Sequence, residues 1–150
     1  MAADEYSCWA HDTFLSRIGP LTGRVSGAVL EGVDSETWIA TCAPGPGPAR
    51  YRLYPGALFL LWCEALGGAG SSRGAEPVAA ALELIHNSSL VHDDVIDGHD
   101  RRRGQETLQY LHGPAFAVLA GDGLFGTALR MLASVEAARL AGILQRLGGL

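Results

Sequence analysis

The stretch "LIHNSSLVHDDVIDGHDRRRG", Leu84 to Gly104, joins an apolar helical pattern to a dense cluster of charged residues. Upstream, Pro77 suits the first turn of a helix, where the amide hydrogen that proline lacks is not needed. Apolar residues then recur at helical spacing as far as Ile96, and Gly98 is a typical helix stop. The pattern therefore predicts one long helix from about Pro77 to Gly98.

Acidic residues gather on one face of this predicted helix. With about 100° between successive residues, His86, Leu90, Asp93 and Asp97 fall within a stripe of about 60°, and Asp94 lies beside it. Carboxylates one turn apart repel each other. They also lie near the helix C-terminus, where the helix dipole disfavours anions. The arrangement is therefore costly unless cations occupy it.

Two kinds of cation can stabilise these carboxylates. Mg²⁺ takes oxygen ligands and commonly bridges carboxylates to substrate phosphates, which makes Asp93 and Asp97 candidate metal ligands. Arg101, Arg102 and Arg103 follow after a short turn, and their forked donors suit phosphate oxygens. The alternative is a solvated helix end whose acids are neutralised by these arginines. The shared stripe and the arginine triplet favour a metal-bridged diphosphate site.

The rest of the chain predicts an all-α domain. There is no internal repeat and no alternation of period two. Residues 1–48 read as a helical or irregular segment that ends in the Pro/Gly-rich linker "CAPGPGPA", and residues 49–150 read as one helical domain. The predicted helices, besides the one above, are "LYPGALFLLWCEALGG" ending at Gly67–Gly68, a second from near Pro114 to about Ala133, and a third over Val135 to Leu147.

Composition excludes several classes of protein. The hydrophobic fraction of 48% argues against a disordered chain, and the net charge of −5 argues against a nucleic-acid binder. All 11 basic residues are arginine, so lysine Schiff-base chemistry and P-loop nucleotide binding are excluded. Three scattered cysteines indicate reduced thiols and a cytoplasmic protein. The acidic N-terminus is unlike a signal peptide, and apolar runs such as "PGALFLLWC" are too short to span a membrane.

The segments "ALELIHNSSLVHDDVIDGHDRRRGQET" and "HGPAFAVLAGDGLFGTAL" resemble the first aspartate-rich motif and the following helix of trans-isoprenyl diphosphate synthases, the polyprenyl synthetases. The resemblance covers roughly residues 50 to 134 and reaches back to "LYPGALFLLWCEALGG". It implies the isoprenoid synthase fold, a bundle of long helices around a deep apolar cavity, of which this chain holds the first half. It also implies a prenyltransferase.

The resemblance assigns roles to the charged residues. Asp93 and Asp97 would hold Mg²⁺ against the diphosphate of an allylic substrate, with Asp94 in support and Arg102 gripping the same diphosphate. Arg103 and His86 would contact the diphosphate of isopentenyl diphosphate. In the family, metals and arginines stabilise the departing diphosphate, and the isopentenyl double bond attacks the allylic cation that remains.

In the family, product length depends on the bulk of the residues four and five places before the first aspartate. Ser89 and Ser88 stand there and are small, so the resemblance implies a product of C20 or longer. The local alternative is that these serines only hydrogen-bond to the preceding helical turn.

The chain departs from the family in two ways. A family motif that binds isopentenyl diphosphate has cations where this chain has Tyr51 and Tyr54, although Arg50 and Arg52 lie next to them. A phenol is neutral near neutral pH and cannot replace the attraction of a cation for a diphosphate. The family also continues into a second aspartate-rich motif. We therefore expect a fragment, a degenerate relative, or one component of a split enzyme, working as a homodimer or as a hetero-oligomer with a chain that supplies that motif.

Two other functions compete with chain elongation. One is a terpene synthase-like relative that ionises an allylic diphosphate without condensing it, and the other is a non-catalytic subunit of a full-length synthase. Two local patterns carry less weight. "GDGLFG", Gly121 to Gly126, matches a dinucleotide-binding motif, but close helix packing explains its glycines better, with Asp122 supporting the polar site. His99 and His112 are predicted to be loop residues rather than ligands.

Overall fold

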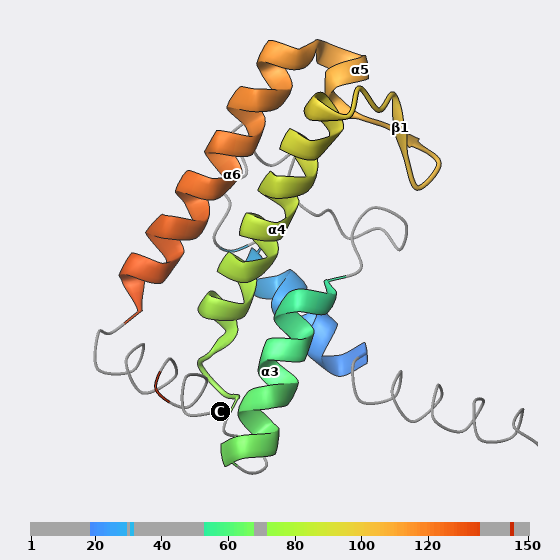
Figure 1. Ribbon diagram of the computed structural model, residues 1–150. Coiled ribbons are helices and arrows are strands. Elements are labelled where there is room, and N and C mark those ends of the chain that lie inside the picture. The colour runs from blue at the N-terminus through green and yellow to red at the C-terminus, as the bar shows by residue number, and fades with distance from the viewer. Residues whose placement is uncertain (1–18, 30, 32–52, 68–71, 136–144, 146–150) are drawn as a thin grey trace, which may run out of the picture.

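The computed structural model describes residues 19–29, 31, 53–67, 72–135 and 145. These residues form a bundle of helices with one short hairpin at its end, which confirms the all-α prediction (Figure 1). The elements are a helix over 19–29, α3 (Tyr54–Gly67), α4 (Glu76–Ile96), β1 (Arg101–Arg102), β2 (Gln105–Glu106), α5 (Leu108–His112) and α6 (Pro114–Ser134).

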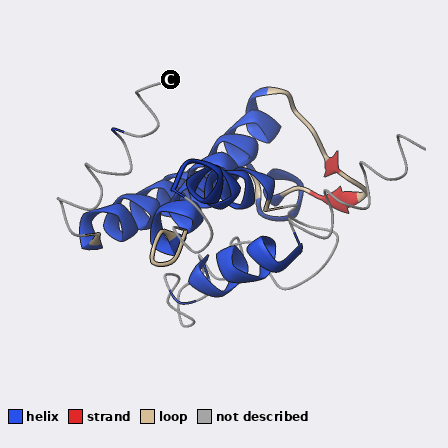
Figure 2. Ribbon diagram, turned by 90° about the horizontal axis from the view of Figure 1, so that it is seen from below, coloured by secondary structure: helices blue, strands red, loops and turns tan. Residues whose placement is uncertain are grey.

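Helix α4 runs through the middle of the bundle. It packs along α6 on one side and against α3 on the other (Figures 1 and 2). Ala79, Ala80 and Ala81 are fully buried, and their small side chains let neighbouring helices approach closely. Leu60, Leu84 and Leu124 are also fully buried, one on each of these three helices. Burial of each such side chain contributes about 1.5–3 kcal/mol to folding.

Gly56 fixes where α3 crosses α4. A Cβ atom at this position would lie 2.6 Å from the carbonyl oxygen of Ala79, so only glycine fits. The Gly56 amide also donates a 2.8 Å hydrogen bond to Oε1 of Glu83, whose side chain lies inside the bundle with 1% exposure. Burial raises the pKa of Glu83, and the hydrogen bond from Gly56 offsets part of that rise.

The segment after α4 folds into a hairpin that the sequence pattern did not predict. "RRRGQET" was expected to be a polar connector, yet Arg101 pairs with Glu106 and Arg102 with Gln105 in an antiparallel ladder. Arg103 and Gly104 form the turn with φ values of 52° and 81°. Positive φ at both central residues suits tight hairpin turns, where Asn-Gly is the usual signal. An Arg-Gly pair is not a typical signal for such a turn, so the sequence pattern did not predict the hairpin.

The predicted helices after the hairpin are confirmed in part. Helix α5 was not predicted, and it contains His112, which was expected in a loop; Thr107 caps it by accepting a hydrogen bond from the Tyr110 amide. Gly113 then turns the chain so that α6 begins at Pro114, as predicted. The predicted helix over Val135 to Leu147, the loop at 42–49 and most of segment 1–48 lie outside the described residues.

Helix α6 is long and apolar enough to cross a membrane by length and composition alone, and within the described part of the chain it is the one such helix. This is weak evidence for a membrane span, because a helix that packs inside a bundle has the same composition. Packing of α6 along α4 accounts for its buried face.

Candidate functional site

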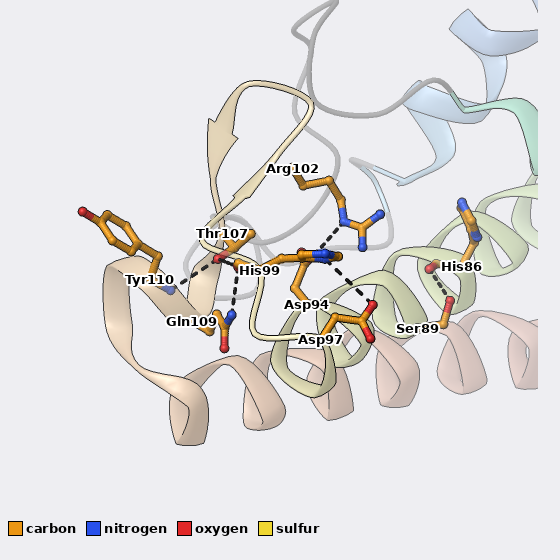
Figure 3. A network of polar contacts seen from close by, with 9 residues as sticks. All are labelled: His86, Ser89, Asp94, Asp97, His99, Arg102, Thr107, Gln109 and Tyr110. Carbon is orange, nitrogen blue, oxygen red and sulfur yellow. Dashed lines mark hydrogen bonds and ion pairs between the residues drawn. The ribbon is translucent and has the colours of Figure 1, made fainter.

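The hairpin returns an arginine to the C-terminal end of α4. Nε of Arg102 donates a 2.7 Å hydrogen bond to Oδ1 of Asp94, and only 11% of the Asp94 side chain is exposed (Figure 3). A charge-assisted bond of this kind is stronger than one between neutral groups. The pair fixes one arginine and one carboxylate of the predicted site in contact with each other.

His99 lies between two of the predicted carboxylates. Its Nδ1 is 3.8 Å from Oδ1 of Asp94 and 3.8 Å from Oδ2 of Asp97 (Figure 3). The His99 carbonyl accepts hydrogen bonds from Thr107 Oγ1 at 2.7 Å and Gln109 Nε2 at 2.8 Å, so the loop that carries it is anchored. His99 does lie in a loop, as predicted, but the sequence reasoning missed its place in the site, because Gly98 breaks the helical spacing.

Asp93 and Asp97 are exposed at the end of α4. They share a helix stripe with His86 and Leu90, both of which line a cavity beside α4. Within the described residues, no group of three or more histidine, cysteine, aspartate or glutamate side chains could hold a metal ion. Two exposed carboxylates one turn apart nevertheless fit Mg²⁺, because this ion usually binds through one or two carboxylates and takes its other oxygens from substrate phosphates and water.

A small cavity of about 50 Å³ lies between α3 and α4. It brings together His86 and Arg103, the two residues assigned to the second diphosphate. Tyr54, which stands where a cation was expected, lines the same cavity. The full lining comprises Leu53, Tyr54, Pro55, Glu83, His86, Asn87, Leu90 and Arg103. Arg52 and Tyr51 lie outside the described residues.

The two serines of the predicted chain-length pocket face different surroundings. Ser88 is buried with 4% exposure, whereas Ser89 is exposed and donates a 2.7 Å hydrogen bond to the carbonyl oxygen of His86 (Figure 3). The local role considered for the serines therefore applies to Ser89. Their effect on product length stays a prediction.

His92 connects the aspartate-rich end of α4 to α6. Its Nε2 lies 3.2 Å from the carbonyl oxygen of Val118 and 3.5 Å from Oδ1 of Asp122. A Cβ atom on Gly121 would overlap the same nitrogen, so the ring packs where a side chain would otherwise stand. Helix packing thus explains Gly121 of the "GDGLFG" pattern, as predicted, but not Gly126, where a Cβ atom would have nothing within 4 Å. His92 itself was not singled out from the sequence.

A comparison with protein families matches residues 50–147 to the polyprenyl synthetase model. The chain belongs to the polyprenyl synthetase family. Among its relatives, the geranylgeranyl diphosphate synthase of Methanosarcina mazei is 44% identical over 85 residues, which are 57% of this chain and 25% of that protein. The geranylgeranyl diphosphate synthase of Mycobacterium tuberculosis is 43% identical over 105 residues, 70% of this chain and 29% of that protein.

Solved structures of family members have the same fold. The decaprenyl diphosphate synthase of Rhodobacter capsulatus superposes with a TM-score of 0.73 at 26% identity, over 88% of this chain and 41% of that one. The geranylgeranyl pyrophosphate synthetase of Geoglobus acetivorans gives a TM-score of 0.65 at 31% identity, over 81% of this chain and 39% of that one. The chain thus spans well under half of the length of these polyprenyl synthetase relatives.

Proposed function

We propose that this chain binds an allylic diphosphate through Mg²⁺ and acts in chain elongation with isopentenyl diphosphate. The main observation behind the proposal is one stripe of side chains on α4. His86 and Leu90 of this stripe line the cavity, and the exposed Asp93 and Asp97 follow them toward the C-terminal end of the helix. A diphosphate bound there lies beside Arg102 and the arginine-bearing hairpin. The family membership supports the same ligand class.

The acidic and basic residues of this site have different roles. Asp93 and Asp97 would hold Mg²⁺, which supplies positive charge against the diphosphate as it leaves. Arg102, fixed by Asp94 at 2.7 Å, keeps a guanidinium at the rim of the site. A donor held in place beforehand stabilises a departing anion without the cost of reorganisation at that moment. Asp94 is thus a positioning residue for Arg102.

The second diphosphate would bind at the cavity between α3 and α4. His86 and Arg103 both line it, one from α4 and one from the hairpin turn. Arg52 is proposed as a further cation for this diphosphate, on the basis of its place in the sequence. With the small Ser88 and Ser89 before the aspartates, we propose a product of C20 or longer.

Elongation requires a second aspartate-rich motif, which in the family faces the first across the cavity. We propose that this chain works as a homodimer or as a hetero-oligomer with a chain that supplies this motif. Large apolar side chains exposed on α6, including Leu119 at 62% and Leu129 at 50%, support an association of this kind. A cytoplasmic location, expected from the cysteines, stays a prediction.

An elongation assay tests the proposal. The chain is incubated with geranyl or farnesyl diphosphate, Mg²⁺ and labelled isopentenyl diphosphate, alone and with a candidate partner chain. We expect label in prenyl diphosphates of C20 or longer when the partner is present. A product confined to C15 would contradict the chain-length proposal, and no uptake of label under any condition would contradict elongation.

One observation favours a second candidate function. Tyr54 places a phenol, not a cation, in the cavity proposed for isopentenyl diphosphate. A terpene synthase-like activity needs only the allylic site, where Asp93, Asp97 and Arg102 are retained. In the same assay, release of diphosphate and free terpene without uptake of labelled isopentenyl diphosphate would support this second function.

A further inference from the structure

The cavity between α3 and α4 is bordered by unusual backbone. Among the described residues, two that are not glycine have positive φ, Leu53 at 48° and Arg103 at 52°. Both line this cavity. Backbone in this region is unfavourable for residues with a side chain, and it concentrates at ligand sites where the surrounding structure holds it. Leu53 is thus held in a strained conformation beside this space, whereas the positive φ of Arg103 belongs to the hairpin turn.

Asn87, which lines this cavity, carries an unsatisfied hydrogen-bond donor. The residue is 1% exposed, and its Nδ2 is buried with no hydrogen-bond partner among the described residues. Buried polar atoms in native proteins are nearly always paired, so an exception requires an explanation such as a bound ligand or water. Asn87 lines the cavity next to His86, which lies one residue before it on α4.

The side chains that line the cavity indicate which kind of ligand would bind there. His86, Arg103 and the Asn87 amide offer hydrogen-bond donors, while Glu83 already accepts the amide of Gly56 through Oε1. The volume of about 50 Å³ admits a polar group at the cavity floor, since about 10–15 Å³ is enough for one water molecule. A ligand with several acceptor oxygens, such as a diphosphate, matches these donors.

We propose that Asn87 is a further ligand-binding residue, whose Nδ2 donates a hydrogen bond to an oxygen of the diphosphate held by His86 and Arg103. This inference rests on the proposed function, which assigns that diphosphate to isopentenyl diphosphate. A hydrogen bond to a charged oxygen is stronger than one between neutral groups. Asn87 thereby supplies part of the binding that Tyr54, as a phenol, does not.

The substitution Asn87→Leu tests the role of the amide. Leucine keeps the branched shape and removes the donor, and Asn87→Ala, which cannot extend into the cavity, separates loss of the donor from filling of the ligand's space. We expect isopentenyl diphosphate to bind about tenfold more weakly by isothermal titration, because a hydrogen bond to a charged group is lost. The thermal midpoint of the ligand-free chain should stay the same or rise, since a buried unpaired donor has been removed.

A matched control comes from Thr127, another buried polar residue with 1% exposure. Its Oγ1 donates a 2.9 Å hydrogen bond to the carbonyl oxygen of Gly123 within α6. Thr127→Val should lower the thermal midpoint and leave the affinity for isopentenyl diphosphate unchanged. Asn87→Leu should therefore weaken binding without lowering stability, whereas Thr127→Val should lower stability without weakening binding.

Three results would overturn the inference. If the unsubstituted chain binds and Asn87→Leu binds equally well, the amide is satisfied by water and only this inference fails. If Asn87→Leu lowers the midpoint as Thr127→Val does and keeps its affinity, Asn87 is structural. If the unsubstituted chain does not bind isopentenyl diphosphate, the proposed use of the cavity fails together with the inference. If Asn87→Leu does not fold, Asn87→Ala is measured instead. An affinity for isopentenyl diphosphate equal to that of the unsubstituted chain would then overturn the inference.

Discussion

At the scale of single residues, two buried carboxylates of α4 differ in the group that compensates their charge. Asp94 and Glu83 are both acidic residues of α4, and both are buried. Asp94 receives a guanidinium from the hairpin, whereas the hydrogen bond to Glu83 among the described residues comes from the neutral Gly56 amide. Burying a carboxylate without a cation is costly, which is why burial raises the pKa of Glu83.

This environment of Glu83 predicts a pH dependence of stability. Since its pKa in the folded chain lies above the ordinary value of 4.5, the folded state binds a proton that the unfolded state releases. The stability that Glu83 contributes is therefore full below about pH 4.5 and is lost as pH rises through the raised pKa. Glu83→Gln keeps an acceptor for Gly56 and cannot ionise, so its advantage over the unsubstituted chain should grow with pH in urea unfolding.

Glu83→Ala is the matched comparison for this prediction. It leaves the buried Gly56 amide without its acceptor and should be about 1–3 kcal/mol less stable than Glu83→Gln at every pH. A constant difference between Glu83→Gln and the unsubstituted chain across the pH series would show that the carboxyl group does not titrate differently on folding.

At the scale of elements, the sequence predicted α3, α4 and α6 and missed α5 and the hairpin between α4 and α6. The starts near Pro77 and at Pro114 and the end at Gly67 could be predicted, because proline suits the first helical turn and glycine readily adopts the conformations that end a helix. The stripe of His86, Leu90, Asp93 and Asp97 followed from helical spacing alone. Contacts that depend on the return of the chain, such as Arg102 with Asp94, could not be predicted from helical spacing, because the unpredicted hairpin turn at Arg103 and Gly104 sets them.

The contact of α4 with α6 at His92 gives a prediction for packing. Gly121→Ala should destabilise the chain by about 1–3 kcal/mol, because its Cβ would overlap the His92 ring. Adding His92→Ala should recover much of that loss. Gly126→Ala, on the same helix with nothing within 4 Å of the new Cβ, should instead stabilise by about 0.5–1 kcal/mol.

Chemical denaturation of the two single variants and the double variant measures the coupling between His92 and Gly121. We expect a coupling free energy of about 0.5–3 kcal/mol, typical of residues in contact. A Gly121→Ala variant as stable as Gly126→Ala would contradict the close packing described here.

At the scale of the whole molecule, the bundle exposes apolar surface that a partner would cover. Val118, Leu119, Phe125 and Leu129 are each at least 41% exposed on α6. Phe125→Arg should weaken association of the chain with itself or with the chain that supplies the second motif. Light scattering should then give a mass nearer the 15.8 kDa of one chain, whereas Arg130→Ser on the same helix should change nothing. A single-chain mass for the unsubstituted protein, alone and with its partner, would contradict the association.

The most direct test of the central claim is Mg²⁺-dependent binding of an allylic diphosphate, measured by isothermal titration with farnesyl diphosphate. We predict binding that requires Mg²⁺ and weakens at least about tenfold in Asp93→Asn and Asp97→Asn, a loss of about 1.4 kcal/mol or more. Glu31→Gln, which removes the same charge from an exposed position outside α4, should bind as the unsubstituted chain does. Binding of equal strength without Mg²⁺, or in the two aspartate variants, would contradict a metal-bridged diphosphate site on α4.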